Sequence, residues 1–201
     1  MLAERLASSL LTPEAAAAMD AHGNVEAAVL VPLFERNGEL HAVFTRRRSD
    51  MRRHAGEISF PGGRRDFPAE DLGETALRET EEEIGLGREL VEIVGALPPT
   101  PTFVTGYRIN PFVGLIADGS RWVPQPTEVE EVLELSLAAL SRGFELRRLV
   151  RRGVPFKTAT YTVGDAFVWG ATARILGHLL ERIGPLGVIE ARDGETDFGD
   201  D

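Results

Sequence analysis

Three glutamates within five residues carry the strongest chemical signal in this chain. Glu79, Glu82 and Glu83 fall in the run RETEEEIGL at residues 78–86. At 3.6 residues per turn, a helix over residues 71–84 places the three glutamates on one stripe, because positions three and four apart are neighbours. The sequence therefore predicts a helix that aims three carboxylates in a single direction.

The remaining positions of this helix predict which of its sides is buried and where it ends. Its adjoining side is expected to face the core and carries Ala76, Leu77, Thr80 and Ile84. Gly85 follows the last helical residue, where a glycine typically terminates a helix. One side of the helix is thus expected to be buried while the other presents the carboxylates.

The glutamate run has two interpretations. On an exposed helix, like charges at this spacing cost only a few tenths of a kcal/mol per pair, so the run can be a solvated face. In a cleft, two charges about 6 Å apart repel by about 3 kcal/mol at an effective dielectric constant of about 20, and they need a cation. Carboxylate oxygens are the ligands that Mg²⁺ and Mn²⁺ prefer.

The segment before the helix favours the metal interpretation. Residues 60–63 read Phe-Pro-Gly-Gly and are expected to end a strand sharply. Glycines at such a turn let the backbone approach a ligand closely and leave a carbonyl free to face it.

Glycine turn and helix together resemble the signature of the Nudix hydrolases. That signature is a glycine, five residues, Glu, seven residues, and then Arg-Glu-(apolar)-x-Glu-Glu-x-Gly-(apolar). Residues 78–86 match its second half, with Thr80 at the apolar position. In the first half, Glu70 lies seven residues before Arg78, but six residues rather than five separate it from Gly63. We interpret the difference as a one-residue insertion in the loop at residues 66–68, which leaves the role of Glu70 open.

The resemblance implies a reaction and a set of roles. Nudix hydrolases cleave a nucleoside diphosphate linked to another group, by attack of water on phosphorus with a divalent metal. Glu79, Glu82 and Glu83 would hold Mg²⁺ or Mn²⁺, and the carbonyl of Gly62 could add a ligand. Arg78 would orient the carboxylates, which makes these glutamates and Arg78 the catalytic candidates.

A second resemblance concerns the substrate. The coenzyme A pyrophosphatase branch of the family has a longer motif that ends in Phe-Pro-Gly-Gly. In order, it begins with two apolar residues, Thr, any residue, Arg and a small residue. After three further residues comes Arg, after three more Gly, and after three more Phe-Pro-Gly-Gly. Arg48 departs from this pattern at the small-residue position. The matching positions are Val43, Phe44, Thr45, Arg47, Arg52, Gly56 and residues 60–63.

In that branch the element at residues 45–63 is associated with recognition of the coenzyme. The resemblance implies a CoA diphosphatase that releases 3′,5′-ADP and 4′-phosphopantetheine, or acyl-phosphopantetheine from a CoA thioester. Arginine side chains beside the turn could hold the 3′-phosphate. The predicted substrate-binding residues are Arg47, Arg52, Gly56, Phe60 and Gly63.

The arginines around the turn are themselves open to two interpretations. They occupy residues 46–48, 52–53 and 64–65. A cluster of this kind is commonly a solvated basic loop, but its position beside the expected phosphate site favours anion binding.

Two alternatives to the CoA assignment remain at this point. One is a Nudix enzyme for another diphosphate, such as ADP-ribose, a dinucleoside polyphosphate or a nucleotide sugar. The other is a Nudix-like domain that binds a ligand without catalysis. A further carboxylate from outside the helix is also open, with Glu128 and Glu131 as candidates and a solvated strand edge as the alternative.

Composition narrows the class of protein. The 201 residues include no cysteine, which excludes disulfides, thiol nucleophiles and zinc–thiolate sites. A net charge of −10 argues against non-specific nucleic-acid binding. No apolar run approaches the roughly 20 residues of a membrane span, and no signal peptide is recognised. A cytoplasmic protein with a small-molecule substrate and no membrane partner is expected, with its oligomeric state open.

The resemblance covers most of residues 26–180 and implies an α/β fold, the Nudix-type α/β/α sandwich with a mixed β-sheet. We expect a single domain over residues 1–201. The expected helices are a peripheral helical segment at 1–24, a helix at 137–149, and a last helix that opens at Phe167 with Trp169 in the core. Hairpins are expected to turn at Asn37-Gly38 and Gly164-Asp165. A frayed acidic tail is expected at 194–201.

Overall fold

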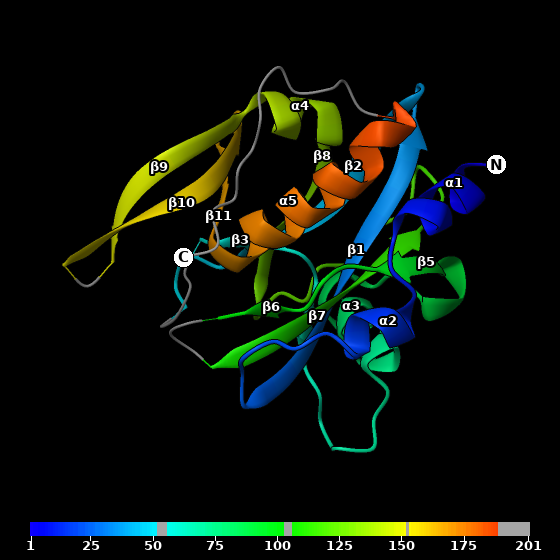
Figure 1. Cartoon of the computed structure of the whole chain (residues 1–201), viewed down its shortest axis with the longest axis horizontal. Coiled ribbons are helices and arrows are strands. Elements are labelled where there is room, and N and C mark those ends of the chain that lie inside the picture. Colours follow the sequence, from blue (N-terminus) through cyan, green and yellow to red (C-terminus); the bar gives the residue numbers. More distant parts are fainter. Residues whose placement is uncertain (52–55, 103–105, 152, 189–201) are drawn as a thin grey trace.

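The computed structural model describes residues 1–51, 56–102, 106–151 and 153–188 (Figure 1). Its main sheet contains β1 (Val25–Arg36), β2 (Glu39–Arg47), β3 (Ile58–Ser59), β4 (Gly62–Arg64), β5 (Glu92–Ala96), β6 (Thr100–Pro101), β7 (Tyr107–Leu115) and β8 (Val129–Ser136). β1 and β7 are parallel, whereas the other pairings are antiparallel. The predicted mixed sheet is therefore confirmed.

A smaller antiparallel sheet and the helices complete the fold. The smaller sheet consists of β9 (Phe144–Arg151), β10 (Val154–Val163) and β11 (Ala166–Trp169). The helices are α1 (Leu2–Ser9), α2 (Pro13–Ala17), α3 (Leu72–Ile84), α4 (Leu137–Arg142) and α5 (Gly170–Ile183), with short 3₁₀ turns η1 (Arg88–Leu90) and η2 (Gly184–Leu186).

Helices cover both faces of the main sheet, which gives the expected α/β/α sandwich (Figure 1). Successive side chains of a strand point to opposite faces, and β1 shows the consequence. Leu30 packs in the cluster that contains Ile84 of α3, and Val31 packs in the cluster that contains Leu176 of α5. All four side chains are completely buried or nearly so.

Two local predictions hold because their determinants are local. Asn37 and Gly38 both have positive φ, 54° and 81°, and join β1 to β2 as an Asn-Gly hairpin turn should. Near the N-terminus, Thr12 caps α2 by accepting a hydrogen bond from the backbone N–H of Ala15, with Pro13 in the first helical position.

Helix α3 begins and ends where the sequence predicts. The Asp71 side chain accepts hydrogen bonds from two N–H groups of the first turn, and Gly85 ends the helix in the left-handed conformation with φ 71°. Thr80 is buried at the position that is apolar in the family signature. Its hydroxyl donates to the carbonyl of Ala76 at 2.7 Å, so the buried threonine hydroxyl is satisfied within the helix.

The predicted helix over residues 137–149 is wrong beyond its first turns. α4 ends at Arg142, and β9 begins at Phe144, which pairs with Tyr161 of β10. A Cβ at Gly143 would overlap the carbonyl of Thr162, so only glycine lets the chain turn this closely into the second sheet. The pairing partner lies some 17 residues further along the chain (161 − 144) and leaves no local signal.

The last helix also starts later than predicted. Phe167 and Trp169 belong to β11, where they pair with Thr162 and Thr160, and α5 begins at Gly170. Trp169 is only partly buried, so its assignment to the core is wrong. The hairpin turn before it, Gly164-Asp165, is confirmed. The acidic tail at 194–201 lies outside the described residues.

Among the helices that the structure describes, none is both long enough and apolar enough to cross a membrane.

Candidate active site

Two glycines bring the backbone of β4 against helix α3. Gly62 and Gly63 pair with Val29 and Ala28 of β1. A Cβ at Gly62 would overlap the backbone of both β1 residues, and its φ of 150° also favours glycine. The expected sharp turn is present, and it lies directly under the carboxylate side of the helix.

Glu83 is the carboxylate that this turn encloses most fully. Its Oε2 accepts a hydrogen bond from the backbone N–H of Gly62 at 3.2 Å. Burial first, and then the negative charges of Glu128 and Glu79, raise the pKa of Glu83 to about 7 against the opposing effects of the Gly62 hydrogen bond and Arg47. This carboxylate is poorly solvated and favours a cation beside it.

Glu79 lies one turn earlier against the second glycine. A Cβ at Gly63 would overlap the Glu79 carboxyl group, so the close approach depends on glycine. The Glu79 side chain is 19% exposed, and burial raises its pKa despite a 2.9 Å hydrogen bond from Arg78. Glu79 and Glu83 therefore form a partly dehydrated carboxylate pair on the turn.

Arg78 connects the carboxylates to one another. Its Nε donates to Glu70 at 2.9 Å, and its Nη1 donates to Glu79 at 2.9 Å and to Glu82 at 3.4 Å. Its Nη2 also reaches the backbone carbonyl of Arg64 on β4, at 3.2 Å. These contacts support the predicted orienting role, because one rigid guanidinium fixes several acidic side chains.

The inserted loop leaves Glu70 beside Arg78. The Glu70 carboxylate also accepts the backbone N–H of Asp66 at 2.9 Å, and its own N–H donates to Phe67 at 3.0 Å. The hydrogen bond from Arg78, followed by that from Asp66, lowers the pKa of Glu70 to about 2. Phe67 protrudes into solvent, so the extra residue is accommodated outside the site.

Glu82 occupies the rim, with its side chain 61% exposed. The three glutamates therefore share a direction but differ in burial. Within the described ranges, no three acidic, histidine or cysteine side chains come close enough together to form a ready-made metal cluster. The donor set still fits a hard divalent cation, since the side-chain donors are oxygens and two of the carboxylates are partly buried.

Arg47 and Glu128 face this carboxylate pair from the sheet. Their side chains approach to 3.8 Å, and both act electrostatically on Glu83. The buried Nε of Arg47 has no hydrogen-bond partner among the described residues. Glu131, the other candidate carboxylate, instead pairs with Arg46 at 3.1 Å. The two candidates were equivalent in sequence, and the structure brings only Glu128 towards Glu83.

Other predicted substrate-binding residues lie in different surroundings. Phe60 is buried and stacks on Phe44 with 4.5 Å between ring centroids, so its ring supports the turn from the core. Gly56 is exposed at the rim of a separate pocket. Arg52 lies outside the described residues.

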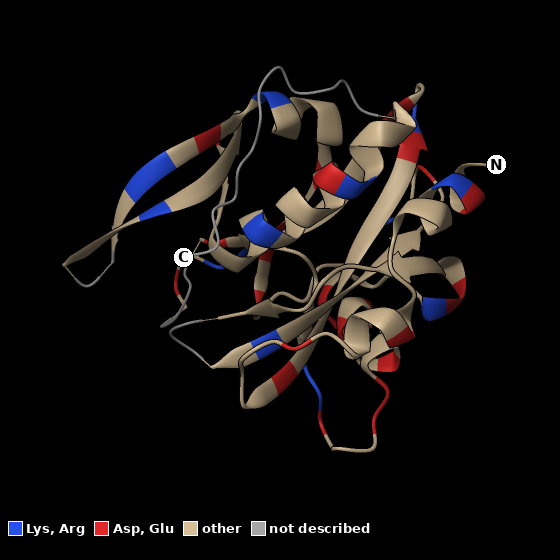
Figure 2. Cartoon of the chain, in the orientation of Figure 1, with Lys and Arg blue, Asp and Glu red and all other residues tan. Residues whose placement is uncertain are grey.

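The arginine cluster does not converge as a unit. Arg48, which departs from the family pattern, is paired with Asp50 at 2.6 Å and with the carbonyl of Pro126 at 3.0 Å. Arg46 is paired on the opposite side of its strand from Arg47. Other basic residues lie on the projecting β9–β10 hairpin, away from α3 (Figure 2).

With this geometry, comparisons with known proteins identify the family. The model of the NUDIX domain matches residues 24–152. The chain belongs to the Nudix family. It is 38% identical over 167 residues to an uncharacterised Nudix hydrolase, NudL, of Pectobacterium atrosepticum, covering 81% of this chain and 84% of that protein. It is also 38% identical over 161 residues to a NudL of Salmonella paratyphi B, covering 79% and 83%.

Solved structures agree with the fold. A MutT/nudix family protein of Enterococcus faecalis matches with a TM-score of 0.54 and 15% identity, covering 83% of this chain and 64% of that one. The protein is accordingly a Nudix hydrolase that acts on nucleoside diphosphate derivatives. Members of this family generally use divalent metals such as Mg²⁺ or Mn²⁺.

Replacing either buried carboxylate should abolish most activity without unfolding the protein. Glu83→Gln and Glu79→Gln are nearly isosteric, and each removes a charge that a cation would need, so we expect turnover to fall by a factor of about 10² or more. The matched control is Glu81→Gln, since Glu81 points away and approaches Arg88 at 3.5 Å. Equal losses at Glu81 and Glu83 in Mn²⁺-dependent turnover would contradict the site.

Gly63→Ala tests the close approach of β4 and α3. The new methyl group would occupy the space of the Glu79 carboxyl group, which is the movable end of a side chain. We expect circular dichroism and thermal unfolding to change little while turnover falls at least about 10-fold. Gly184→Ala, at a position where a Cβ meets no atom and φ is −53°, is the control for the substitution itself. Full activity in Gly63→Ala would show that Glu79 need not touch the turn.

Glu70 should stabilise the fold in a pH-dependent way. Its pKa is lowered on folding, so its contribution is present above its unfolded value near 4.5 and is lost as the pH falls towards about 2. We expect Glu70→Gln to reduce the free energy of unfolding by roughly 1–2 kcal/mol at pH 7 and by less at pH 3. Glu74→Gln, which removes only an exposed pair with Arg88, should cost less than about 1 kcal/mol. A Glu70 effect that grew on acidification would be incompatible with this account.

Proposed function

We propose that this Nudix hydrolase cleaves the diphosphate of coenzyme A or its thioesters, releasing 3′,5′-ADP and 4′-phosphopantetheine or its acylated form. One observation carries the proposal. Arg47, from the element at residues 45–63 that resembles the CoA branch, lies beside the buried carboxylates with an unpartnered Nε among the described residues. The element that resembles the CoA branch and the acidic helix thus lie next to each other, which supports the proposal.

The proposed roles follow from the contacts. Glu79, Glu82 and Glu83, with the Gly62 carbonyl, would hold Mg²⁺ or Mn²⁺. When bound, the metal neutralises diphosphate charge and makes a coordinated water more acidic. Arg78 fixes Glu79 and Glu82 through its guanidinium, so its replacement would misalign the donor set without removing a ligand.

Two further groups act on the substrate side. The side chain of Arg47 is 35% exposed, so the accessible part of its guanidinium is placed to donate to a phosphate oxygen. Glu128 is the stronger candidate to accept the proton of the attacking water, since it faces Glu83 while Glu131 is held by Arg46.

The alternatives are distinguishable. Another nucleoside diphosphate, such as ADP-ribose, a dinucleoside polyphosphate or a nucleotide sugar, would use the same carboxylates but not require the 3′-phosphate. A non-catalytic binding domain is disfavoured, because burying the Glu79–Glu83 pair costs free energy that simple binding does not demand.

The test is product analysis by mass after incubation with CoA and Mn²⁺. We expect 3′,5′-ADP and 4′-phosphopantetheine, formed at least about 100-fold more slowly by Glu83→Gln. A second comparison uses 3′-dephospho-CoA, for which kcat/KM should be at least about 10-fold lower if arginines hold the 3′-phosphate. Intact CoA alongside cleavage of ADP-ribose would overturn the substrate assignment and leave the reaction class in place.

A further inference from the structure

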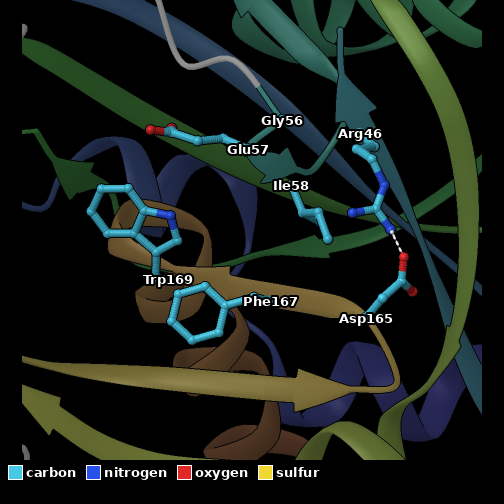
Figure 3. A pocket seen from close by; sticks show the side chains of 7 residues that line it. All are labelled: Arg46, Gly56, Glu57, Ile58, Asp165, Phe167 and Trp169. Carbon is cyan, nitrogen blue, oxygen red and sulfur yellow. Dashed lines mark hydrogen bonds and ion pairs between the residues drawn. The ribbon is translucent and has the colours of Figure 1, made fainter. Parts of the chain in front are cut away.

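A hollow of about 360 Å³ lies between β3 and β11, apart from the carboxylate pair (Figure 3). One side is formed by aromatic rings of β11, and the other by the start of β3. Its lining residues are Arg46, Gly56, Glu57, Ile58, Asp165, Phe167 and Trp169.

The alternation of β11 explains why two aromatic rings face this hollow. Val168 is completely buried in the core, so Phe167 and Trp169 on either side of it point to the opposite face. The guanidinium of Arg147 lies 5.5 Å from the ring centroid of Phe167 and holds that ring in place. Ile58, buried in the core, adds an aliphatic surface across the hollow.

The polar groups of the hollow restrict its ligand. Arg46 is engaged by Asp165 at 3.0 Å and by Glu131 at 3.1 Å, so its positive charge is already balanced. Glu57 adds a further carboxylate at the Trp169 end. A phosphate group would find no uncommitted cation among these lining residues. A neutral flat ring with N–H donors would find stacking surfaces and carboxylate acceptors together.

The hollow is connected to the active site by the chain itself. Arg46 and its neighbour Arg47 point to opposite faces of β2, one into the hollow and the other towards Glu83. Ile58 and Gly62 are four residues apart, so their Cα atoms are separated by at most about 14 Å. Among the described strands β3 pairs with β2 alone, and β2 carries both arginines.

We propose that this hollow binds the adenine base of the substrate, stacked on Trp169 and Phe167. The inference rests on the proposed function for the identity of the nucleotide, because the diphosphate of that nucleotide would lie at Glu79 and Glu83. In a nucleotide only a ribose separates base from diphosphate, which suits two neighbouring sites. The aromatic pair favours the base over the flexible pantetheine arm, whose amides and methyl groups do not require flat surfaces.

Tryptophan fluorescence gives a direct test without turnover. The chain has two tryptophans, so Trp122→Phe leaves Trp169 as the reporter. Adenosine, which carries no phosphate, should quench this emission saturably in the Trp122→Phe protein. The matched Trp169→Phe protein reports on Trp122 and should respond little. Quenching by pantetheine but not by adenosine, or no saturable quenching at all, would overturn the proposal.

Kinetics provide the second measurement. Trp169→Ala should raise KM for CoA by about 10-fold or more with little change in kcat, and Trp169→Phe should restore most of the loss because a ring is kept. An unchanged KM in Trp169→Ala would contradict the proposed base site even if CoA is cleaved. Adenosine quenching without CoA cleavage would instead retain the base site and reject the proposed substrate.

Discussion

Burial of the Glu79 and Glu83 carboxylates against the backbone of β4 is the constraint on which the site depends. Dehydrated carboxylates are costly, and each is stabilised here by a specific partner: Arg78 for Glu79, and the N–H of Gly62 for Glu83. Neither contact could form if Gly62 or Gly63 carried a side chain, since a Cβ would overlap β1 or Glu79. The two glycines are thus needed for the turn and also for the contacts that stabilise the two carboxylates.

Helix α3 packs one side into the core and presents its carboxylates on the other. A few local interactions allow it to do both. Asp71 and Gly85 fix its ends, and the buried side chains of Ala76, Thr80 and Ile84 fix the direction in which the carboxylates point. Thr80 satisfies its hydroxyl within the helix and so tolerates the core. Glu70 reaches Arg78 from the preceding loop, which explains how an inserted residue leaves the donor set undisturbed.

What could be predicted from sequence was largely what local periodicity determines. The helix at α3, the Asn37-Gly38 hairpin and the carboxylate stripe follow from spacings within a few residues. Most of β9 was predicted as helix because its partner, β10, contributes nothing to the local pattern. Trp169 was assigned to the core because it was expected in a helix, whereas in β11 the buried side is that of Val168. Glu128 and Glu131 were equivalent candidates, since only the cross-strand pairing of Arg46 separates them.

An irregularity in the pairing of β2 with β8 accounts for that separation. Arg46 lies opposite Glu131, but a bulge shifts the register so that Arg47 lies opposite Val129. An unbroken antiparallel ladder would have placed Glu130 opposite Arg47. The bypassed Glu130 instead accepts the backbone N–H of Ser49 at 3.0 Å, and Glu128 becomes the acidic neighbour of Arg47. A single extra residue in β8 thereby places one arginine and one carboxylate at the buried pair, while Arg46 is directed to the hollow on the other face.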